Sequence, residues 1–272
     1  ILRCLVGSEM CIRDRYTWGT VGIIYNTKYV TKTVDSWDIL WDEDYAKKIL
    51  MFDNSRDAFA IALEKLGYSV NTENVDEINE AAELLKAQKP LVQNYVMDQI
   101  FDKMVEENAW VAPYYAGDFI TMHEDNENLA FAFPKEGSNF FVDAMCIPKG
   151  CKNKEAAEMF INFMCEPKIS AENCGATGYS TPITAAKDLI DPELAASEYA
   201  YPSEEILSKT EKFINLSDDT NKLLDDLWIS ISVTGLSVGF WIAVAVVVIA
   251  VIAVCIVAMS RKKKRESMRT SE

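Results

Sequence analysis

The sequence feature that most constrains this chain is a stretch of 22 uncharged residues near its C-terminal end, residues 238–259. A helix of this length spans about 33 Å, slightly more than the roughly 30 Å hydrocarbon core of a bilayer. Five basic residues follow at positions 261–265. Because basic residues stay on the cytoplasmic side, we predict a single-pass cell-membrane protein. Its transmembrane helix covers residues 236–260, the tail 261–272 is cytoplasmic, and the preceding domain is extracytoplasmic, in the periplasm or at the cell surface.

Two other interpretations of this stretch are disfavoured. A core helix of a globular domain seldom stays apolar on all sides for so long and then meets a run of cations. A cleaved lipid-anchor signal ends without a basic stop.

The charge of the chain is unevenly distributed. The formal net charge is −15, yet residues 261–272 contain six basic and only two acidic side chains. The rest of the chain is therefore strongly acidic, which disfavours nucleic acid as a partner and attracts small cations by long-range steering. Solubility alone also accounts for an acidic surface.

The cysteines and the single histidine offer little for metal or nucleophile chemistry. The chain has seven cysteines without a Cys-x-x-Cys pair, and its only histidine is His123, beside two acidic residues. Zinc, haem and Cys-His nucleophile sites need clusters of these residues. We predict no catalytic residue, no metal and no cofactor, and we expect His123 in a solvated loop. The cysteines either form a disulfide or serve as small buried hydrophobic residues.

Hydrophobic patterning predicts short strands that alternate with helices. We expect strands over residues 16–25, 48–52, 110–115, 129–133 and 140–147, a short helix or turn over 37–41, helices over 56–66, 74–88, 97–107 and 155–165, and an acidic helical stretch that ends at Trp228. This order is typical of an α/β architecture with a mainly parallel sheet.

Aromatic residues stand beside carboxylates at the ends of several predicted elements. Asp143 interrupts an apolar strand and lies two residues after Phe141, so both side chains share one face. A ring and an anion on one face suit an ammonium group with an alkyl tail. A strand-end aspartate that caps the following turn explains Asp143 equally well.

Two further groups of polar residues are best explained as the starts of helices. Asp118 follows Tyr115 and Gly117 at a strand end, where a helix cap is favoured over a ligand group. Asn54 and Asp57 begin a predicted helix, and a helix dipole alone accounts for an acidic residue in the first turn.

Four stretches in this order resemble the spermidine/putrescine-binding proteins of polyamine ABC transporters. They are YTWGTVGIIYN from residue 16, SWDILWDEDYAKKILMFDNSRDAFAIALEKLGYSVNT from residue 36, FPKEGSNFFVDAMCIPKGCKNKEAAEMFINF from residue 133, and GYSTP from residue 178. The resemblance covers roughly residues 16–228. It implies a periplasmic-binding-protein-like fold of type II, in which two α/β lobes close around a ligand by hinge motion.

The resemblance also implies ligand contacts, with carboxylates on the ammonium groups and rings along the methylene chain. The matching positions are Asn54, Asp57, Tyr115, Phe141, Asp143 and Tyr179. Asn54 stands where the family usually has an acid, and Tyr115 and Phe141 stand where tryptophan is common. Asp118 is a cap or a supporting residue behind these contacts.

The same resemblance predicts how the chain is divided. Residues 16–35 are a remnant of the first lobe with a crossing strand, 36–142 the second lobe, 143–187 a first-lobe segment, and 188–230 the C-terminal segment of the second lobe. The family has about a hundred more residues before Tyr16, so we expect an incomplete first lobe and a fragmentary sequence. Residues 1–15 resemble translated sequencing-adapter read-through, and we expect them to be non-native.

Taken together, these features predict the membrane-tethered substrate-binding component of a polyamine importer. It would deliver spermidine or putrescine to a permease driven by a cytoplasmic ATPase. A binding protein for another small cationic solute, or an anchored sensor or adhesion domain without a transport role, also fits the sequence.

Overall fold

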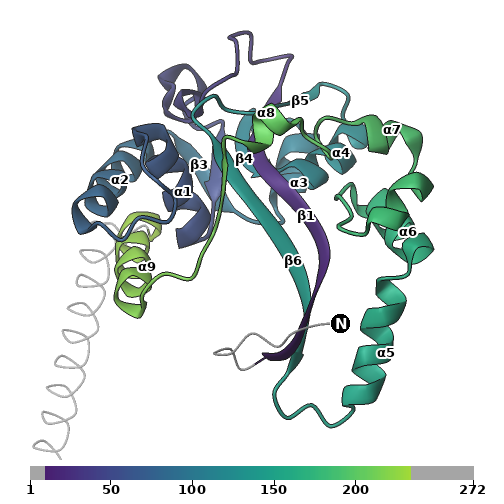
Figure 1. Ribbon diagram of the computed structural model, residues 1–272. Helices are drawn as coiled ribbons and strands as arrows, with labels where there is room; N and C mark the ends of the chain where they lie inside the picture. Colours follow the sequence, from purple (N-terminus) through teal and green to yellow (C-terminus); the bar gives the residue numbers. More distant parts are fainter. Residues whose placement is uncertain (1–9, 234–272) are drawn as a thin grey trace, which may run out of the picture. The chain divides into compact units, whose positions relative to one another are not determined.

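The computed structural model describes residues 10–233, with side chains from residue 15. In this part of the chain, seven strands form one sheet in the order β3-β2-β4-β1-β6-β7, and β5 pairs with β1 (Figure 1). The strands are β1 (Met10–Asn26), β2 (Ile49–Phe52), β3 (Val92–Val96), β4 (Val111–Tyr115), β5 (Leu129–Ala132), β6 (Ser138–Pro148) and β7 (Thr210–Lys212).

The helices of the described region surround this sheet. The α-helices are α1 (Ser55–Leu66), α2 (Val75–Gln88), α3 (Ile100–Val105), α4 (Ala116–Asp125), α5 (Lys154–Met164), α6 (Pro167–Thr177), α7 (Pro192–Ala196), α8 (Glu204–Leu207) and α9 (Asp218–Ser232). Short 3₁₀ helices are η1 (Trp37–Trp41), η2 (Glu43–Tyr45) and η3 (Thr184–Leu189). α1, α2 and α9 contact one another and lie side by side (Figure 1).

The main core lies between β2, β4 and the helices that cover them. Phe52 and Phe59 are almost fully buried, and Trp37 from η1 is completely buried against them. Asn54 caps the start of α1, and Gly67 ends the helix with a positive φ of 78°. This packing fixes the first turn of α1 against the end of β2.

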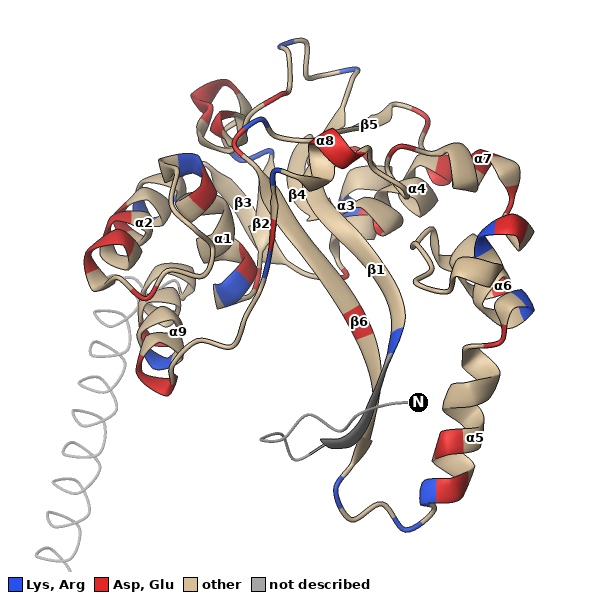
Figure 2. Ribbon diagram, viewed as in Figure 1, with Lys and Arg blue, Asp and Glu red and all other residues tan. Residues whose placement is uncertain are grey.

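β1 and β6 are the two longest strands, and they run antiparallel away from this core (Figure 1). β1 pairs with β4 and β5 over residues 21–26 and with β6 over residues 10–20. Both strands are uncharged along most of their length (Figure 2), and Asp143 is the one charged residue of β6. β1 and β6 therefore extend from the core toward α5 and α6. These two helices contact each other.

α5 has an exposed apolar side. Met159, Phe160 and Phe163 are 67%, 58% and 47% exposed, and Figure 2 shows charge at only one end of this helix. Among the cysteines whose side chains are described, Cys146, Cys151 and Cys174 carry free thiols.

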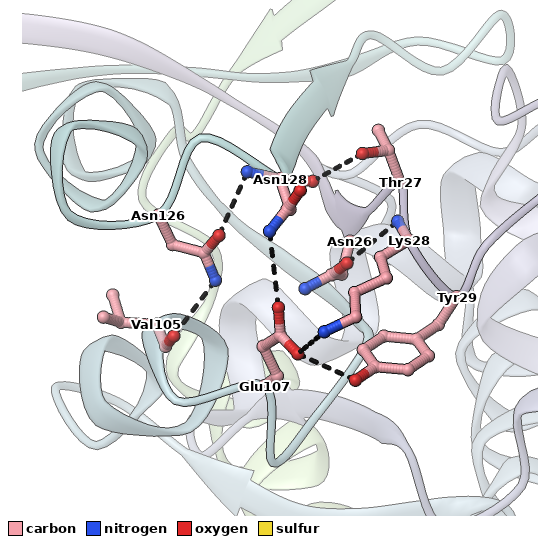
Figure 3. A network of polar contacts seen from close by, with 8 residues as sticks. All are labelled: Asn26, Thr27, Lys28, Tyr29, Val105, Glu107, Asn126 and Asn128. Atoms are coloured by element: carbon pink, nitrogen blue, oxygen red, sulfur yellow. Dashed lines mark hydrogen bonds and ion pairs between the residues drawn. The ribbon is translucent and has the colours of Figure 1, made fainter.

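A polar network fixes the turn that ends β1 (Figure 3). The Glu107 carboxylate accepts hydrogen bonds from Lys28 Nζ over 2.8 Å, from the Tyr29 hydroxyl over 2.7 Å and from Asn128 Nδ2 over 3.4 Å. Asn26, which is fully buried, accepts from the backbone N–H of Lys28. These contacts tie β1 to the loops before β4 and β5.

The structure corrects the expected mainly parallel sheet. β2 runs parallel to β3 and β4, and β6 runs parallel to β7, but β1 is antiparallel to β4, β5 and β6. The sheet is therefore mixed. Alternation of strands and helices indicates the class of fold but does not set the direction of a strand that crosses between distant segments.

Several local expectations also change. His123 lies in α4 rather than in a solvated loop, and its Nδ1 is 2.8 Å from the backbone oxygen of Leu129. The strand β3 and the helices α4 and α6 were not anticipated. The acidic stretch before Trp228 is not one helix, because η3, α7, α8, β7 and α9 divide it.

The predicted membrane segment, residues 236–260, and the tail 261–272 lie outside the described residues. Within residues 10–233, none of the helices is both long and apolar enough to cross a membrane. The lobe boundaries stay a prediction, as does the division at residue 15, although β1 includes residues 10–15.

Candidate functional site

The first turn of α1 places an amide and a carboxylate beyond the end of β2. Oδ1 of Asn54 accepts a hydrogen bond from the backbone N–H of Asp57 over 2.8 Å, which caps the helix. Nδ2 of Asn54 donates to Oδ2 of Asp57 over 2.7 Å. Asn54 therefore stabilises the helix start and also orients the Asp57 side chain.

Tyr115 holds the same carboxylate from the end of β4. Its hydroxyl donates to Oδ2 of Asp57 over 3.1 Å. Burial raises the pKa of Asp57, and the hydrogen bonds from Asn54 and Tyr115 oppose this shift. Burial, followed by the nearby Asp57, also raises the pKa of Tyr115, so its hydroxyl stays a donor. Neutral donors thus hold Asp57, and the nearby charge of Arg56 also lowers its pKa.

Phe141 in β6 continues the site from Tyr115. Its ring centroid lies 5.1 Å from that of Tyr115 and 6.1 Å from that of Tyr179, with edge-on geometry in both pairs. Gly19 is opposite Phe141 on β1, and a Cβ there would lie 2.9 Å from Phe141 Cζ. Glycine at this position leaves room for the ring. Tyr115, Phe141 and Tyr179 therefore form a row of three rings.

Tyr179, the third ring of this row, lies in the connection that follows α6. The next residue, Ser180, exchanges two backbone hydrogen bonds of 3.0 and 3.2 Å with Trp18 of β1. The Tyr179 hydroxyl donates to Oδ2 of Asp118 over 2.9 Å. Gly117 lies against the Tyr179 ring, since a Cβ at Gly117 would be only 2.5 Å from Cδ2 of the tyrosine.

Asp118 is half-buried in the first turn of α4, where it contacts Tyr179. Burial raises the pKa of Asp118 to about 6, the Tyr179 hydrogen bond opposes the shift, and the charges of Asp98 and Asp143 add to it. The expectation that Asp118 caps the helix is wrong. Tyr115 precedes the first helical residue, and the Asp118 carboxylate accepts from Tyr179 instead of from the backbone of α4.

Asp143 lies on the Phe141 face of β6 and is exposed. Oδ2 of Asp143 accepts a hydrogen bond from the Thr17 hydroxyl of β1 over 2.6 Å. Asp118 and Asp143 line one cavity of about 410 Å³. Its other lining residues are Tyr16, Thr17, Thr121, Ala176, Thr177 and Tyr179.

The structure brings all the predicted site residues into one connected series. Polar contacts and ring contacts link Asn54, Asp57, Tyr115, Phe141, Tyr179 and Asp118 in that order, and Asp143 faces Asp118 across the cavity. Asn54, Asp57, Tyr115 and Phe141 do not line that cavity. The binding role of these residues stays a prediction.

Three polar residues of the site were not identified from the sequence. Thr17 and Thr121 line the cavity, and Asp98 contributes negative charge near Asp118. Regular pairing of β1 with β6 would not have found Thr17, because the register of the two strands shifts between Arg15 and Trp18. Asp98 follows β3, which the sequence patterning missed.

Among the described residues, the carboxylates of the site are not joined to a basic side chain in an ion pair, although the charge of Arg56 acts on Asp57. None of the ion pairs within residues 15–233 involves Asp57, Asp118 or Asp143. Arg56, which adjoins Asp57, donates to Asn71 over 2.9 Å and lies over the ring of Phe213. Carboxylates at both ends of a row of rings suit an organic cation with an apolar chain.

Comparison with known proteins decides the family. The family model described as bacterial extracellular solute-binding protein matches residues 12–210. The chain belongs to this family. Its members are solute-binding proteins rather than enzymes, which confirms that part of the sequence-based prediction.

Relatives and solved structures of this solute-binding family agree with the resemblance seen in the sequence. A spermidine/putrescine-binding periplasmic protein of Salmonella typhimurium is 36% identical over 197 residues, or 72% of this chain and 57% of the relative. The putrescine-binding periplasmic protein SpuD of Pseudomonas aeruginosa is 30% identical over 79% of this chain and 64% of its own length. The chain thus spans about three fifths of the curated relatives that it matches.

Solved structures give the same fold. The substrate-binding protein PotD of a Streptococcus pneumoniae spermidine/putrescine ABC transporter superimposes with a TM-score of 0.71 at 32% identity. The match covers 81% of this chain and 68% of PotD. The predicted α/β periplasmic-binding-protein fold is therefore confirmed.

Proposed function

We propose that this chain is the extracytoplasmic substrate-binding component of a polyamine ABC importer and that it binds spermidine or putrescine. The observation that carries the proposal is the row of three rings with Asp57 at one end and Asp118 and Asp143 at the other. The solute-binding family and relatives named for spermidine and putrescine support the same ligand class.

Each part of the site matches a part of such a ligand. Carboxylates form strong charge-assisted hydrogen bonds to ammonium groups. Ring faces bury the methylenes between them, at about 0.8 kcal/mol for each CH₂ removed from water. A neutral solute of the same length would give Asp57 and Asp143 no cationic partner and would bind more weakly.

A panel of ligands in thermal unfolding tests the proposal. We expect putrescine, cadaverine and spermidine to raise the Tm of the full chain, because a ligand that binds only the folded state stabilises it. Butylamine has the same carbon chain as putrescine but one charge, and butane-1,4-diol has none, so both should be much weaker. Equal shifts with butylamine and putrescine, or no shift with any amine at about 10 mM, would contradict the proposal.

A second candidate ligand class is supported by one residue. Asn54 offers an amide where polyamine-binding relatives are expected to have an acid, so one ammonium contact is weaker at this end. A smaller ligand with a single cationic group would depend less on the residue at position 54. Such a ligand would stabilise the chain more than any diamine in the same panel.

We further propose that residues 236–260 tether the domain to the cell membrane, where it would deliver ligand to permease and ATPase subunits. The support is the uncharged length of this segment and the basic residues after it. Intact cells expressing the chain should lose the binding domain to external protease and keep the basic tail protected. A chain that stops at residue 235 should be released from the membrane fraction, and its retention would contradict the tether.

A further inference from the structure

The buried indole of Trp37 joins three elements that are far apart in the sequence. Its Nε1–H donates to Oε2 of Glu64 in α1 over 2.9 Å and to the backbone oxygen of Gly137 over 3.1 Å. Trp37 is completely buried, and Glu64 is buried as well. Because Gly137 comes immediately before β6, this shared hydrogen bond connects η1 and α1 to the start of that strand.

Glu136 fastens the same loop to η1. Its carboxylate accepts hydrogen bonds from the Ser36 hydroxyl and, over 3.4 Å, from the backbone N–H of Trp37. Gly137 has a positive φ of 118°, and a Cβ there would lie 2.6 Å from the backbone oxygen of Lys209. A larger residue would be strained at this point, so the path of the chain into β6 is closely restricted.

α1 is attached to the sheet at two points. In its first turn, Asp57 accepts a hydrogen bond from the Tyr115 hydroxyl of β4. In its last turn, Glu64 accepts from the indole that also bonds the start of β6. Asp57 and Glu64 are about two helical turns apart and therefore lie on the same side of α1. The second attachment leads to the strand that contributes Phe141 to the row of rings.

Stability alone does not account for a carboxyl group at this position. In the described part of the chain, Oε1 of Glu64 has no hydrogen-bond partner. Burial raises the pKa of Glu64 to about 8, the charges of Glu211, Glu136 and Asp57 add to the shift, and the Trp37 hydrogen bond opposes it. The side chain is therefore mostly an uncharged carboxylic acid at neutral pH. A leucine of similar size would avoid the cost of burying it.

We infer that Glu64 is a positioning residue for the ligand site. Acting through Trp37, it fixes the last turn of α1 against the start of β6. Asp57 is thereby held at a set distance from Phe141 and Asp143 of that strand. Without the carboxyl group, α1 can tilt about its first turn, and a displacement of about 1 Å in a binding group is enough to weaken binding several-fold. This inference rests on the proposed amine-binding function and adds a residue that does not touch the ligand.

Two substitutions of Glu64 test the inference by calorimetry of the full chain with putrescine at about pH 7. Glu64→Gln keeps a neutral acceptor for the indole, so its affinity should equal that of the wild-type chain. Glu64→Leu removes this acceptor but leaves the indole bonded to Gly137, and we expect roughly three- to tenfold weaker binding. Thermal unfolding should show Glu64→Leu to be at least as stable as the wild-type chain, because an apolar side chain replaces a buried acid.

Ile78→Val is the control for a loss of stability away from this junction. Ile78 is completely buried in α2, so the shorter side chain should lower the Tm. Its putrescine affinity should stay unchanged. Weaker binding by Glu64→Leu without lower stability would then separate positioning from a general effect on folding. Wild-type affinity in Glu64→Leu would overturn the inference.

Hydrogen exchange in the unmutated chain covers the case in which Glu64→Leu fails to fold. If Glu64 and Trp37 position the ligand-binding groups, bound ligand stabilises their contacts by the same coupling free energy. Putrescine should therefore slow exchange of the Trp37 indole and of the backbone amides of residues 136–140, and change α2 less. Unchanged exchange at these groups with putrescine bound would overturn the positioning role while leaving amine binding intact.

A ligand-free comparison separates this inference from the proposed function. Absence of amine binding in the wild-type chain would overturn the proposed function. Exchange of the amides of residues 136–140 should still be faster in Glu64→Leu than in Glu64→Gln, because only Glu64→Leu lacks an acceptor in α1 for the indole. Equal exchange in the two variants would overturn the role assigned to Glu64.

Discussion

The hydroxyl of Tyr115 donates a hydrogen bond to Oδ2 of Asp57 over 3.1 Å, and the two residues are 58 positions apart in the chain. The contact joins the end of β4 to the first turn of α1. It gives Tyr115 two roles, because the same ring also packs against Phe141 at 5.1 Å. The position of the carboxylate and the position of the ring are therefore linked.

Tyr115→Phe separates these two roles. The variant keeps the ring but removes one donor to Asp57, so we expect a three- to tenfold loss of putrescine affinity, on the order of 1 kcal/mol. The loss should grow at acidic pH, because the missing hydrogen bond lets the pKa of Asp57 rise further. Titrations at two pH values measure both effects.

Tyr115→Leu is the comparison for that variant, since it also removes the ring. Its affinity loss should exceed that of Tyr115→Phe. An equal loss in both variants would show that the ring contributes nothing to binding.

Glu64 also provides a prediction about stability. Its side chain is 6% exposed, and Oε2 accepts a hydrogen bond from the Trp37 indole over 2.9 Å. Burial raises the pKa of Glu64 to about 8, with smaller contributions from Glu211, Glu136 and Asp57. The folded chain therefore keeps a proton on Glu64 that the unfolded chain loses near its ordinary pKa of 4.5.

The free energy of unfolding should consequently fall as the pH rises through this window. Between about pH 5 and about pH 8 the loss from Glu64 is on the order of 2–5 kcal/mol. Glu64→Gln keeps an acceptor for Trp37 but cannot ionise, so its stability should lack this contribution. Urea unfolding at three pH values measures the difference, and parallel curves for the two proteins would refute the assignment.

Gly117 is predicted to be necessary for the placement of Tyr179. An alanine Cβ would lie 2.5 Å from the Tyr179 ring, so Gly117→Ala must displace the ring or the first turn of α4. We expect putrescine affinity to fall at least tenfold. Calorimetry of the variant measures it, with circular dichroism to check that the chain is folded.

Gly175→Ala is the matched control, because it also replaces a helical glycine. A Cβ at Gly175 meets nothing within 4 Å, so this variant should bind normally. It should also gain roughly 0.5–1 kcal/mol of stability from helix propensity. Equal loss of binding in the two variants would contradict the role assigned to Gly117.

Much of the site could be predicted from the sequence because its residues stand at recognisable element ends. Asn54 is followed by a helix with a clear apolar face and a terminal glycine, and Tyr115 and Phe141 lie in strands of strongly apolar character. Family resemblance then indicated which of these ends meet. The ring contacts from Tyr115 to Phe141 and from Phe141 to Tyr179 agree with that indication.

The remaining features of the fold and the site depend on contacts between residues that are distant in the sequence. Local sequence patterns do not predict such contacts. Asp118 is interpreted from the sequence as a helix cap, yet it lies inside α4, which begins at Ala116 and buries Phe119 and Met122. The Asp118–Tyr179 and Thr17–Asp143 hydrogen bonds join residues 61 and 126 positions apart. β3 was missed because polar residues interrupt its apolar pattern.

The most direct test of amine recognition by this site is equilibrium dialysis of radiolabelled putrescine against the wild-type chain and Asp143→Asn. Asp188→Asn removes an exposed carboxylate from η3, outside the site, and serves as the control. We predict saturable binding by the wild-type chain, the same affinity for the control, and at least about tenfold weaker binding by Asp143→Asn. Equal affinity of Asp143→Asn and the wild-type chain would contradict amine binding at this site.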